Sequence, residues 1–408
     1  MSRYDDAVRF LFARQAGRIK WSLGPTEGLL DVLGHPEHHF PSIHVGGTNG
    51  KGSTCAFLTA DLRSRGFKVG LYTSPHLVSA TERILVDGVP ISEDAFAQWT
   101  GILRPHIARL EASFFECLTA IAFADFAARH VDIAVVEVGL GGRLDATNVI
   151  TPLASVVTKI ALEHTDYLGP DLTSIAKEKA GIAKPGVPFV TGEQDPTVLG
   201  VLRAEAERRG AGPVMHVSRF PLPASRLSLG LRGPHQAQNA AVARAALRVL
   251  PEPFGLPGTE IPASFADAFI PGRFEVRGSW IFDVAHNPDG MEILVSALEE
   301  ARPRRPLHAL VGIRNDKEWR PMLERILPAV DRLILTVAPT VPDHQRWLAR
   351  DLAGWADERV IGQPVVFEPD FTRALEMVQE GAATTLVTGS FHTVGDVLAA
   401  LPGFAPVG

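Results

Sequence analysis

A glycine-rich segment at residues 43–53 (Ile-His-Val-Gly-Gly-Thr-Asn-Gly-Lys-Gly-Ser) constrains the fold of this chain more than any other feature. A short apolar stretch leads into the glycines, and an apolar helical pattern follows Lys51 and Ser53 directly. The backbone N–H groups of such a loop and the positive end of the following helix together bind phosphates. In this arrangement Lys51 reaches the β- and γ-phosphates, and Ser53 helps to hold Mg²⁺. The segment therefore predicts a nucleotide-binding strand–loop–helix unit.

The spacing of this loop departs from the common nucleoside-triphosphate pattern. Gly52 separates the lysine from the hydroxyl, and Val45 stands where the common pattern has glycine. An ordinary glycine turn between a strand and a helix is the plainer alternative. The order of strand, glycines, lysine and hydroxyl favours phosphate binding over that alternative.

Length and composition limit the class of protein. The chain has 408 residues, enough for two or three domains at roughly 100–200 residues each. Its net charge of −6 gives no sign of nucleic-acid binding. The two cysteines, Cys55 and Cys117, lie in apolar helical stretches and fit a reducing compartment better than a disulfide framework. Because we find neither a signal peptide nor an apolar run of about 18 residues, we expect a cytoplasmic protein without membrane contact.

Alternating strand and helix patterns predict an α/β fold. Residues 68–73 are expected to form the second strand of a β-α-β unit, whose strands should be parallel. A hairpin is expected at 83–91, and a helix at 27–33 with Thr26 as its cap. Residues 251–272, rich in proline and glycine, indicate a domain boundary before a second α/β unit. The strands expected in that unit are 279–283, 307–312, 332–336 and 383–388.

Polar side chains occur at the ends of three predicted strands in the first unit. Ser74 follows strand 68–73, Glu137 lies in the sequence Val-Val-Glu-Val, and His164 follows strand 154–160. The carboxyl ends of parallel strands share one edge of a sheet, so these groups could form a metal site. The plainer alternatives are a serine that caps a turn, a glutamate paired with an arginine, and a surface histidine. A buried carboxylate needs a partner in either case.

Other segments allow two interpretations. Phe114 and Phe115 open a long apolar helix, and on composition they fit a core better than a ligand platform. Lys177, Glu178 and Lys179 read as a charged helix face. Residues 139–148, dense in glycine and polar side chains, are typical of a long functional loop.

Nine motifs in order resemble the folylpolyglutamate synthase/dihydrofolate synthase family of the Mur ligase superfamily. They are residues 47–53, 73–76, 137–148, 163–166, 178–182, 235–239, 271–274, 283–288 and 389–394. The resemblance implies an N-terminal P-loop mononucleotide-binding domain with a mostly parallel sheet, flanking helices and the folate site, at residues 1–271. It also implies a smaller, Rossmann-like C-terminal domain at residues 272–408 that contacts glutamate and nucleotide.

The implied activity is that of an ATP-dependent ligase. It would add L-glutamate to dihydropteroate, and to tetrahydrofolate or its polyglutamates, through an acyl phosphate, with release of ADP and phosphate. ATP and Mg²⁺ would be the cofactors, the substrates would all be small molecules, and the family favours a monomer.

The resemblance also assigns roles to individual residues. The implied ATP-binding residues are Gly50, Lys51, Gly52, Ser53, Asn239, Arg273 and Asp283. The implied metal ligands are Ser53, Ser74, Glu137 and His164. The implied folate-binding residues are Ser113, Phe114, Phe115, Glu116, Leu144, Asp145 and Ala146. Lys51, Lys179 and His286 would act in catalysis, with Lys179 at the position that this family carbamylates and His286 near the incoming glutamate.

One segment departs from the family pattern, and three other functions remain open. Residues 311–317 differ at their small positions, although Asp316 and Lys317 are retained. A Mur-type ligase for a cell-wall precursor would need a nucleotide-sugar domain before residue 43. A P-loop kinase would not need the second α/β unit. A non-catalytic nucleotide switch would leave Glu137 and His164 without a task.

Overall fold

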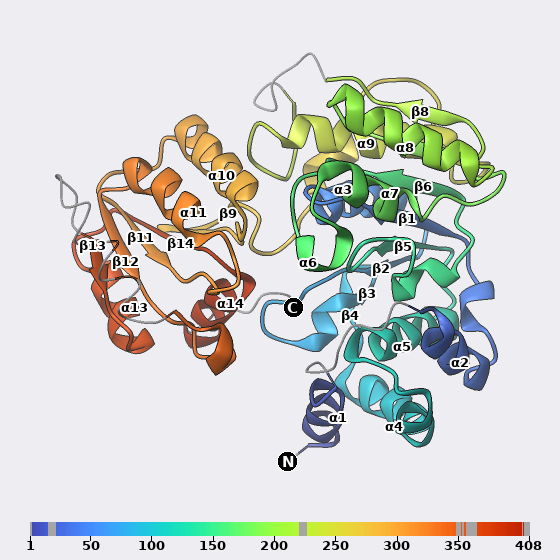
Figure 1. Ribbon diagram of the computed structural model, residues 1–408, viewed down its shortest axis with the longest axis horizontal. Helices are drawn as coiled ribbons and strands as arrows, with labels where there is room; N and C mark the ends of the chain where they lie inside the picture. Colours follow the sequence, from blue (N-terminus) through green and yellow to red (C-terminus); the bar gives the residue numbers. More distant parts are fainter. Residues whose placement is uncertain are drawn as a thin grey trace. The chain divides into compact units, whose positions relative to one another are not determined.

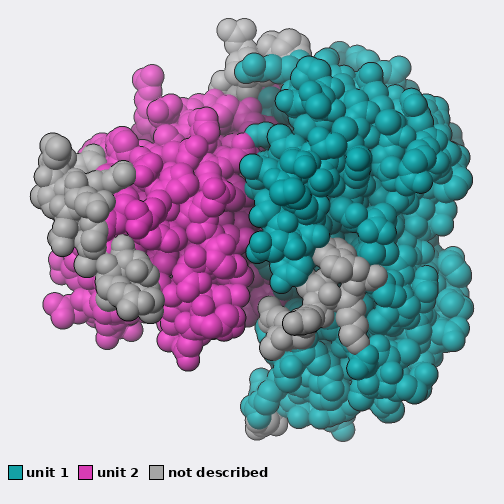
Figure 2. All heavy atoms as spheres, in the orientation of Figure 1, with its two compact units in different colours: residues 1–75, 79–222, 237–269 teal, residues 76–78, 223–236, 270–408 magenta. Residues whose placement is uncertain are grey.

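The computed structural model divides the chain into two compact units (Figures 1 and 2). Unit 1 comprises residues 1–75, 79–222 and 237–269, and unit 2 comprises residues 76–78, 223–236 and 270–408. The structure describes residues 2–14, 22–219, 227–347, 352, 355, 365–401 and 403. The two short segments 76–78 and 223–236 group with unit 2, so the chain passes between the units more than once.

Unit 1 contains an eight-stranded sheet with the strand order β4-β3-β2-β5-β1-β6-β7-β8. The strands are β1 Ser42–Gly46, β2 Val69–Tyr72, β3 Ile84–Val86, β4 Val89–Pro90, β5 Ile133–Glu137, β6 Ala154–Val157, β7 Phe189–Thr191 and β8 Val214–His216. Every pair from β2 to β8 in this order is parallel, and the β3–β4 hairpin adds antiparallel strands at one edge. The predicted mostly parallel sheet is therefore confirmed.

Helices cover both faces of this sheet (Figure 1). The α-helices described in unit 1 are α1 Arg3–Phe12, α2 Gly24–Val32, α3 Lys51–Ser64, α4 Glu93–Leu110, α5 Phe114–Ala128, α6 Thr165–Leu168, α7 Leu172–Ala180, α8 Pro196–Arg208 and α9 Gln236–Val249. Helix α3 packs against β1, β2 and β5. The core under α4 and α5 takes the alternate side chains Tyr72, Ala134 and Val136 from the strands. This alternation follows from the two-residue period of a strand.

Unit 2 contains a six-stranded sheet with the order β13-β12-β11-β14-β10-β9. Its strands are β9 Glu275–Arg277, β10 Trp280–Phe282, β11 Leu307–Val311, β12 Arg332–Leu335, β13 Val365–Phe367 and β14 Thr384–Thr388. Its helices include α10 Pro288–Ala301, α11 Trp319–Ile326, α13 Phe371–Gln379 and α14 Phe391–Ala400. All neighbouring strands are parallel except β9, which runs antiparallel to β10.

The strands of unit 2 bury alternate side chains in two cores. Leu307, Ala309 and Val311 of β11 join the core with α10 and α11, while Leu310 joins the core with α13 and α14. Helices on both faces of a parallel sheet define a doubly wound, Rossmann-like arrangement, as the sequence predicted.

Most predicted elements coincide with observed ones, and one cap does not. The β3–β4 hairpin turns at Asp87 and Gly88, both with positive φ. Thr26 was expected to precede its helix, but α2 begins at Gly24 and Thr26 lies inside it, so that prediction is wrong. Pro25 explains the earlier start, because proline is favoured in the first turn of a helix. Within the described residues, no helix is both long and apolar enough to cross a bilayer.

Candidate active site

The glycine loop joins β1 to α3 in a conformation that needs its glycines. Gly47 and Gly50 have φ values of 129° and 93°, and Gly50 is the N-cap of α3. A Cβ atom on Gly47 would lie 2.0 Å from Thr158 Oγ1, and one on Gly50 would lie 2.4 Å from Asn239 Oδ1. Both positions therefore exclude a side chain on two grounds, the backbone conformation and the close approach of a neighbour.

The segment that follows β6 holds this loop in place. The Lys159 carbonyl accepts a hydrogen bond from Thr48 N at 2.8 Å, and the Thr158 hydroxyl donates to Asn49 O at 2.9 Å. The Thr48 hydroxyl in turn donates to Ala161 O at 3.1 Å. Lys51, the first residue of α3, extends its Nζ to Thr48 O at 3.0 Å. The loop is thus fixed with its lysine beside it.

The extra glycine of the loop has a place in the helix. Gly52 and Ser53 occupy the first turn of α3, and both are buried. The departure from the usual spacing therefore leaves Lys51 and Ser53 at the positive end of one helix, where an anion is stabilised.

Ser74 and Glu137 meet at the ends of two neighbouring strands. Glu137 is the last residue of β5, is 3 % exposed, and lies level with Val45 of β1. Its Oε2 accepts a hydrogen bond from Ser74 N at 3.2 Å. Buried Arg83 interacts electrostatically with the same carboxylate, although burial is the larger effect and lowers the pKa of Arg83. An arginine near Glu137, considered from the sequence, is therefore present as an electrostatic neighbour of this carboxylate.

Lys179 and Glu163 form a buried ion pair next to the glycine loop. Lys179 Nζ lies 2.6 Å from Glu163 Oε1 and donates to Gly47 O at 2.9 Å, and its side chain is 2 % exposed. Burial lowers the pKa of Lys179, and the charge of Glu163 opposes that shift. Burial alone would raise the pKa of Glu163, but Lys179 and Lys51 outweigh it and lower this pKa to about 2.

His164 adjoins this pair in sequence. It has a left-handed φ of 48° and forms the N-cap of the short helix α6. Its charge is one of the smaller influences that lower the pKa of Glu163. Since β6 lies beside β1, His164 follows a strand end on the same edge of the sheet as the glycine loop.

The expected folate-binding residues at the start of α5 divide into three kinds. Ser113 and Glu116 cap the helix reciprocally, with the Ser113 hydroxyl accepting from Glu116 N and the Glu116 carboxylate accepting from Ser113 N. Phe114 is 4 % exposed, and its ring lies 4.6 Å from that of Phe12 in the core. Phe115 is only partly buried, and its ring lies against Gly139, the first residue of the loop 139–148.

Asp145 is turned inward to hold the loop 139–148 together. Its carboxylate accepts hydrogen bonds from Leu140 N at 2.8 Å and from Thr147 N at 3.0 Å. Burial raises the pKa of Asp145. Thr147 also contacts His44 Nε2 of β1 at 2.8 Å. Of the other expected residues in this loop, Ala146 is buried and Leu144 is partly exposed.

Three expected site residues of unit 2 gather at the end of β10. Asp283 accepts hydrogen bonds from Phe274 N at 2.8 Å and Ala285 N at 2.9 Å. Burial raises the pKa of Asp283 to about 6, against the opposing charge of Arg273. The Arg273 guanidinium lies 5.3 Å from the centre of the Phe391 ring, and the His286 ring lies 5.4 Å from it.

Sequence reasoning gave no role to two residues that the structure places in this site. Thr158 holds the glycine loop, and Glu163 neutralises Lys179. The position of Glu163 directly before His164 could have marked it as a site residue. Its pairing with Lys179 could not be predicted from sequence, because it depends on how α7 packs beside the strand end.

The α/β fold and its glycine loop agree with a Mur-type ligase, and comparison with known proteins identifies the chain as one. Residues 272–391 match the family described as Mur ligase, glutamate ligase domain. The dihydrofolate synthase/folylpolyglutamate synthase of Bacillus subtilis is 32 % identical over 426 residues, covering 97 % of this chain and 98 % of that protein. The Escherichia coli enzyme of the same name is 35 % identical over 377 residues, covering 87 % and 85 %.

Solved structures give the same result. Mycobacterium tuberculosis folylpolyglutamate synthase complexed with ADP superposes with a TM-score of 0.85 at 34 % identity, covering 99 % of each chain. The Escherichia coli enzyme in complex with DHPP and ADP superposes with a TM-score of 0.83 at 32 % identity, covering 98 % of this chain and 97 % of that one. The chain therefore belongs to the dihydrofolate synthase/folylpolyglutamate synthase family, the ATP-dependent ligases that attach glutamate to folates.

Removing one member of the buried ion pair should destabilise unit 1 strongly. Glu163→Gln leaves the Lys179 charge buried without its carboxylate, and we expect a loss of about 3–5 kcal/mol in unfolding free energy. Glu178→Gln is the matched control, because Glu178 pairs with the half-exposed Arg143 and should change stability by less than about 1 kcal/mol. Urea unfolding of the full chain measures both, and equal losses in the two variants would contradict the assignment.

The same variant should alter the response to acid. The pKa of Glu163 is about 2 in the folded chain against an ordinary 4.5, so its contribution to stability is present above pH 4.5. That contribution disappears as the pH falls through about 2. Wild-type stability should therefore fall more steeply than that of Glu163→Gln between these two values, and parallel curves would refute the depressed pKa.

Proposed function

We propose that the carboxyl edge of the unit 1 sheet binds ATP and activates a pteroate or folate carboxylate for attack by L-glutamate. The observation that carries this proposal is the fixed glycine loop, with Lys51 at its end and the Lys179–Glu163 pair against Gly47 O. These charges lie at the ends of β1 and β6, next to the end of β5 where Glu137 stands. Few enzyme tasks need so many compensated charges beside a phosphate loop, and phosphoryl transfer is one.

The residues proposed to bind ATP in unit 1 are Gly50, Lys51, Gly52, Ser53 and Asn239. Asn239 of α9 lies against Gly50, so it is beside the loop that would cradle the phosphates. Structures of the Mycobacterium tuberculosis relative are complexes with ADP and AMPPCP, which supports ATP as the nucleotide here.

The same edge carries a donor set that suits Mg²⁺. Glu137 offers a buried carboxylate, and Ser53 and Ser74 offer hydroxyls on neighbouring segments. Mg²⁺ prefers oxygen ligands and commonly takes one or two carboxylates together with substrate phosphates. His164 is proposed as a further ligand, although an imidazole is a weaker partner for this ion. When bound, Mg²⁺ would neutralise the phosphate charge.

For the folate substrate we propose a site at the start of α5 and the loop 139–148. The exposed part of the Phe115 ring, beside Gly139 and together with Leu144, offers an apolar surface for a pteridine. Ser113, Phe114, Glu116, Asp145 and Ala146 would support that surface, since the first four are tied into caps, core or loop. A structure of the Escherichia coli relative holds DHPP, which fits a pterin substrate.

We propose that residues 1–271 bind the nucleotide and the folate. Residues 272–408 would bind glutamate and also contact the nucleotide. In unit 2, Arg273 and Asp283 are the proposed nucleotide contacts, and His286 is the proposed glutamate contact. Arg273 and His286 both lie near the Phe391 ring, and the charge of Arg273 also acts on the pKa of Asp283, which supports a common site on that unit.

The mechanism follows from the chemistry of a carboxylate, which cannot lose an oxide ion. ATP transfers its γ-phosphoryl group to a carboxylate oxygen and gives an acyl phosphate and ADP. Lys51 holds the transferring phosphoryl group and offsets its developing charge. The α-amine of glutamate then attacks the acyl carbon, the amide bond forms, phosphate leaves, and the amine loses its proton.

Lys179 is proposed to react with CO₂, as its counterpart does in this family. Its amine is buried and its pKa is lowered, which raises the fraction of the neutral, reactive form. The reaction joins the amine nitrogen to the carbon of CO₂ and releases one proton. Carbon-13 NMR of the full chain in labelled bicarbonate should give a carbamate signal that Lys179→Arg lacks. A signal of equal size in both proteins, or in neither, would contradict this assignment.

The activity is tested by mass analysis of the ligation products. The purified chain with ATP, Mg²⁺ and glutamate should release phosphate when given dihydropteroate or tetrahydrofolate, and each pterin should gain the mass of one glutamyl residue. ADP formation without glutamate, together with a phosphorylated pterin product that accumulates, would instead indicate a kinase.

Lys51→Ala should reduce ligation by about 100-fold or more, because it removes a charge from the transferring phosphoryl group. Lys68→Ala is the matched control, since Lys68 is exposed and directly precedes β2, at the end of that strand opposite to Ser74. Steady-state rates with either pterin measure both variants. Near-normal ligation by Lys51→Ala would refute the proposed role of the loop.

A further inference from the structure

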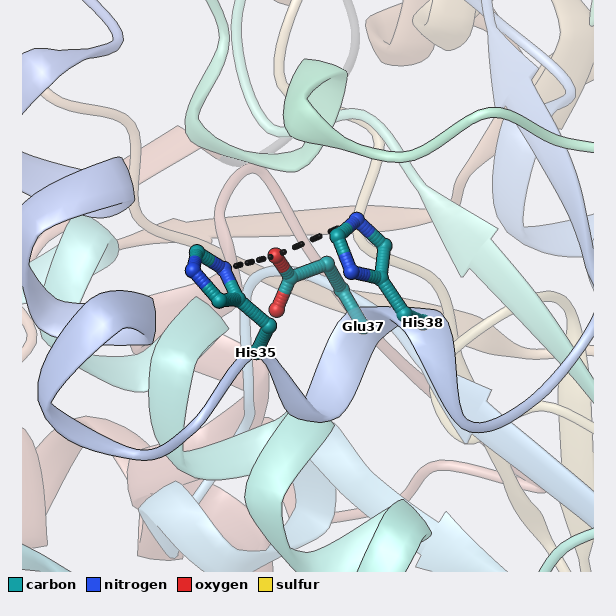
Figure 3. A group of neighbouring side chains, drawn as sticks. All are labelled: His35, Glu37 and His38. Atoms are coloured by element: carbon teal, nitrogen blue, oxygen red, sulfur yellow. Dashed lines mark hydrogen bonds and ion pairs between the residues drawn. The ribbon is translucent and has the colours of Figure 1, made fainter.

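A cluster of two histidines and a glutamate lies between α2 and β1, on a 3-10 turn at Pro36–His38 (Figure 3). His35, Glu37 and His38 each present one ligand atom, and these three atoms all lie within 4.8 Å of one another. His35 Nδ1 is 3.0 Å from Glu37 Oε1, and His38 Nε2 is 3.7 Å from the same oxygen. Among the described residues, this is the one group of three His, Cys, Asp or Glu side chains so arranged.

The backbone that carries the cluster is fixed on both sides. His35 N donates to Leu30 O of α2 at 2.9 Å, and His38 N donates to His35 O at 3.2 Å. Pro36 is buried. After the turn, the Phe40 ring packs edge-on against Phe123 and Phe126 of α5. The backbone positions of the ligands are therefore set before an ion binds, which lowers the ordering cost of binding.

Glu37 has one carboxylate oxygen without a partner, next to the oxygen that faces the histidines. Its side chain is only 6 % exposed, and its Oε2 is buried without a hydrogen-bond partner among the described residues. A buried carboxylate without full compensation costs free energy, and a cation on Oε1 would neutralise its charge.

Asp31 contacts the cluster through the far side of the His35 ring. Its Oδ1 lies 3.1 Å from His35 Nε2, the ring nitrogen that faces away from Glu37. Histidines that bind metals commonly donate their other N–H to a carboxylate, which fixes the ring orientation. Two carboxylates with two neutral imidazoles carry a charge of about −2, which attracts a divalent cation.

We propose that His35 Nδ1, Glu37 Oε1 and His38 Nε2 bind a zinc ion, with Asp31 orienting His35. Two imidazoles and one carboxylate suit Zn²⁺ rather than Mg²⁺, and water would complete its coordination. The site lies before the amino end of β1, whereas the glycine loop follows its carboxyl end, roughly 16 Å further along the strand. The zinc would join the end of α2 to the start of the sheet and take no part in ligation.

The proposal is tested by zinc binding to the full chain. Metal-free protein is dialysed against Zn²⁺ with excess Mg²⁺, which competes at the carboxyl edge, and bound zinc is counted per chain. The wild type and Glu137→Gln should each hold one tightly bound zinc ion that His35→Gln and His38→Gln lack. Asp31→Asn should bind about 10–100-fold more weakly.

His39→Gln is the matched control, because His39 is the exposed neighbour outside the cluster. It should keep the zinc ion, and all the cluster variants should ligate glutamate at the wild-type rate. Equal zinc in the wild type and His38→Gln would overturn the proposal, as would a wild type that holds none. If the wild type holds no zinc, the cluster only forms hydrogen bonds that stabilise the turn. Neither result would bear on the ligase activity, so the two hypotheses fail separately.

Discussion

The parallel pairing of β2, β5, β1 and β6 is the constraint on which the proposed chemistry of unit 1 depends. Parallel strands bring their carboxyl ends to a common edge, and here those ends carry Ser74, Glu137, the glycine loop and the segment before His164. The strand pairing, and not any single residue, brings these groups to one edge of the sheet. A shift of β5 against β1 by one residue would turn the Glu137 side chain to the other face of the sheet and away from Ser74.

Gathering charge at one edge creates a cost that the structure offsets locally. Lys179 is buried beside Gly47 O, and Glu163 supplies the opposite charge at 2.6 Å. Glu137 is buried as well, and it has Ser74 N–H and the field of Arg83. Each buried group thus has a partner before any substrate binds. Such prior compensation lets a site bind polyphosphate without first rearranging its own charges.

Much of the fold could be predicted from sequence, because strand ends, glycines and apolar periods are local signals. The positions of Ser74, Glu137 and His164 at or after the ends of their strands needed only the order of elements. What sequence could not give is the direction of a side chain relative to elements far away. Phe114 and Phe115 are neighbours, yet one enters the core and the other lies against Gly139.

Local rules also compete with one another. The pattern of Ser113 and Glu116 matches a helix capping box, and the structure has that box, although the resemblance assigned both residues to folate. Thr26 looked like a cap, but Pro25 starts α2 earlier. Glu163 and Lys179 are separated by α6 and most of α7, so their pairing emerges only from packing.

The most direct test of the shared edge is the affinity of Mn²⁺, a spectroscopic substitute for Mg²⁺, for the chain with AMPPCP bound. Electron paramagnetic resonance measures free Mn²⁺ in the wild type, in Glu137→Gln and in Glu178→Gln. Glu137→Gln should weaken Mn²⁺ binding by at least about tenfold, because a charged carboxylate ligand is lost, while Glu178→Gln should bind like the wild type. Unchanged Mn²⁺ affinity in Glu137→Gln would show that the cation is not held at the end of β5.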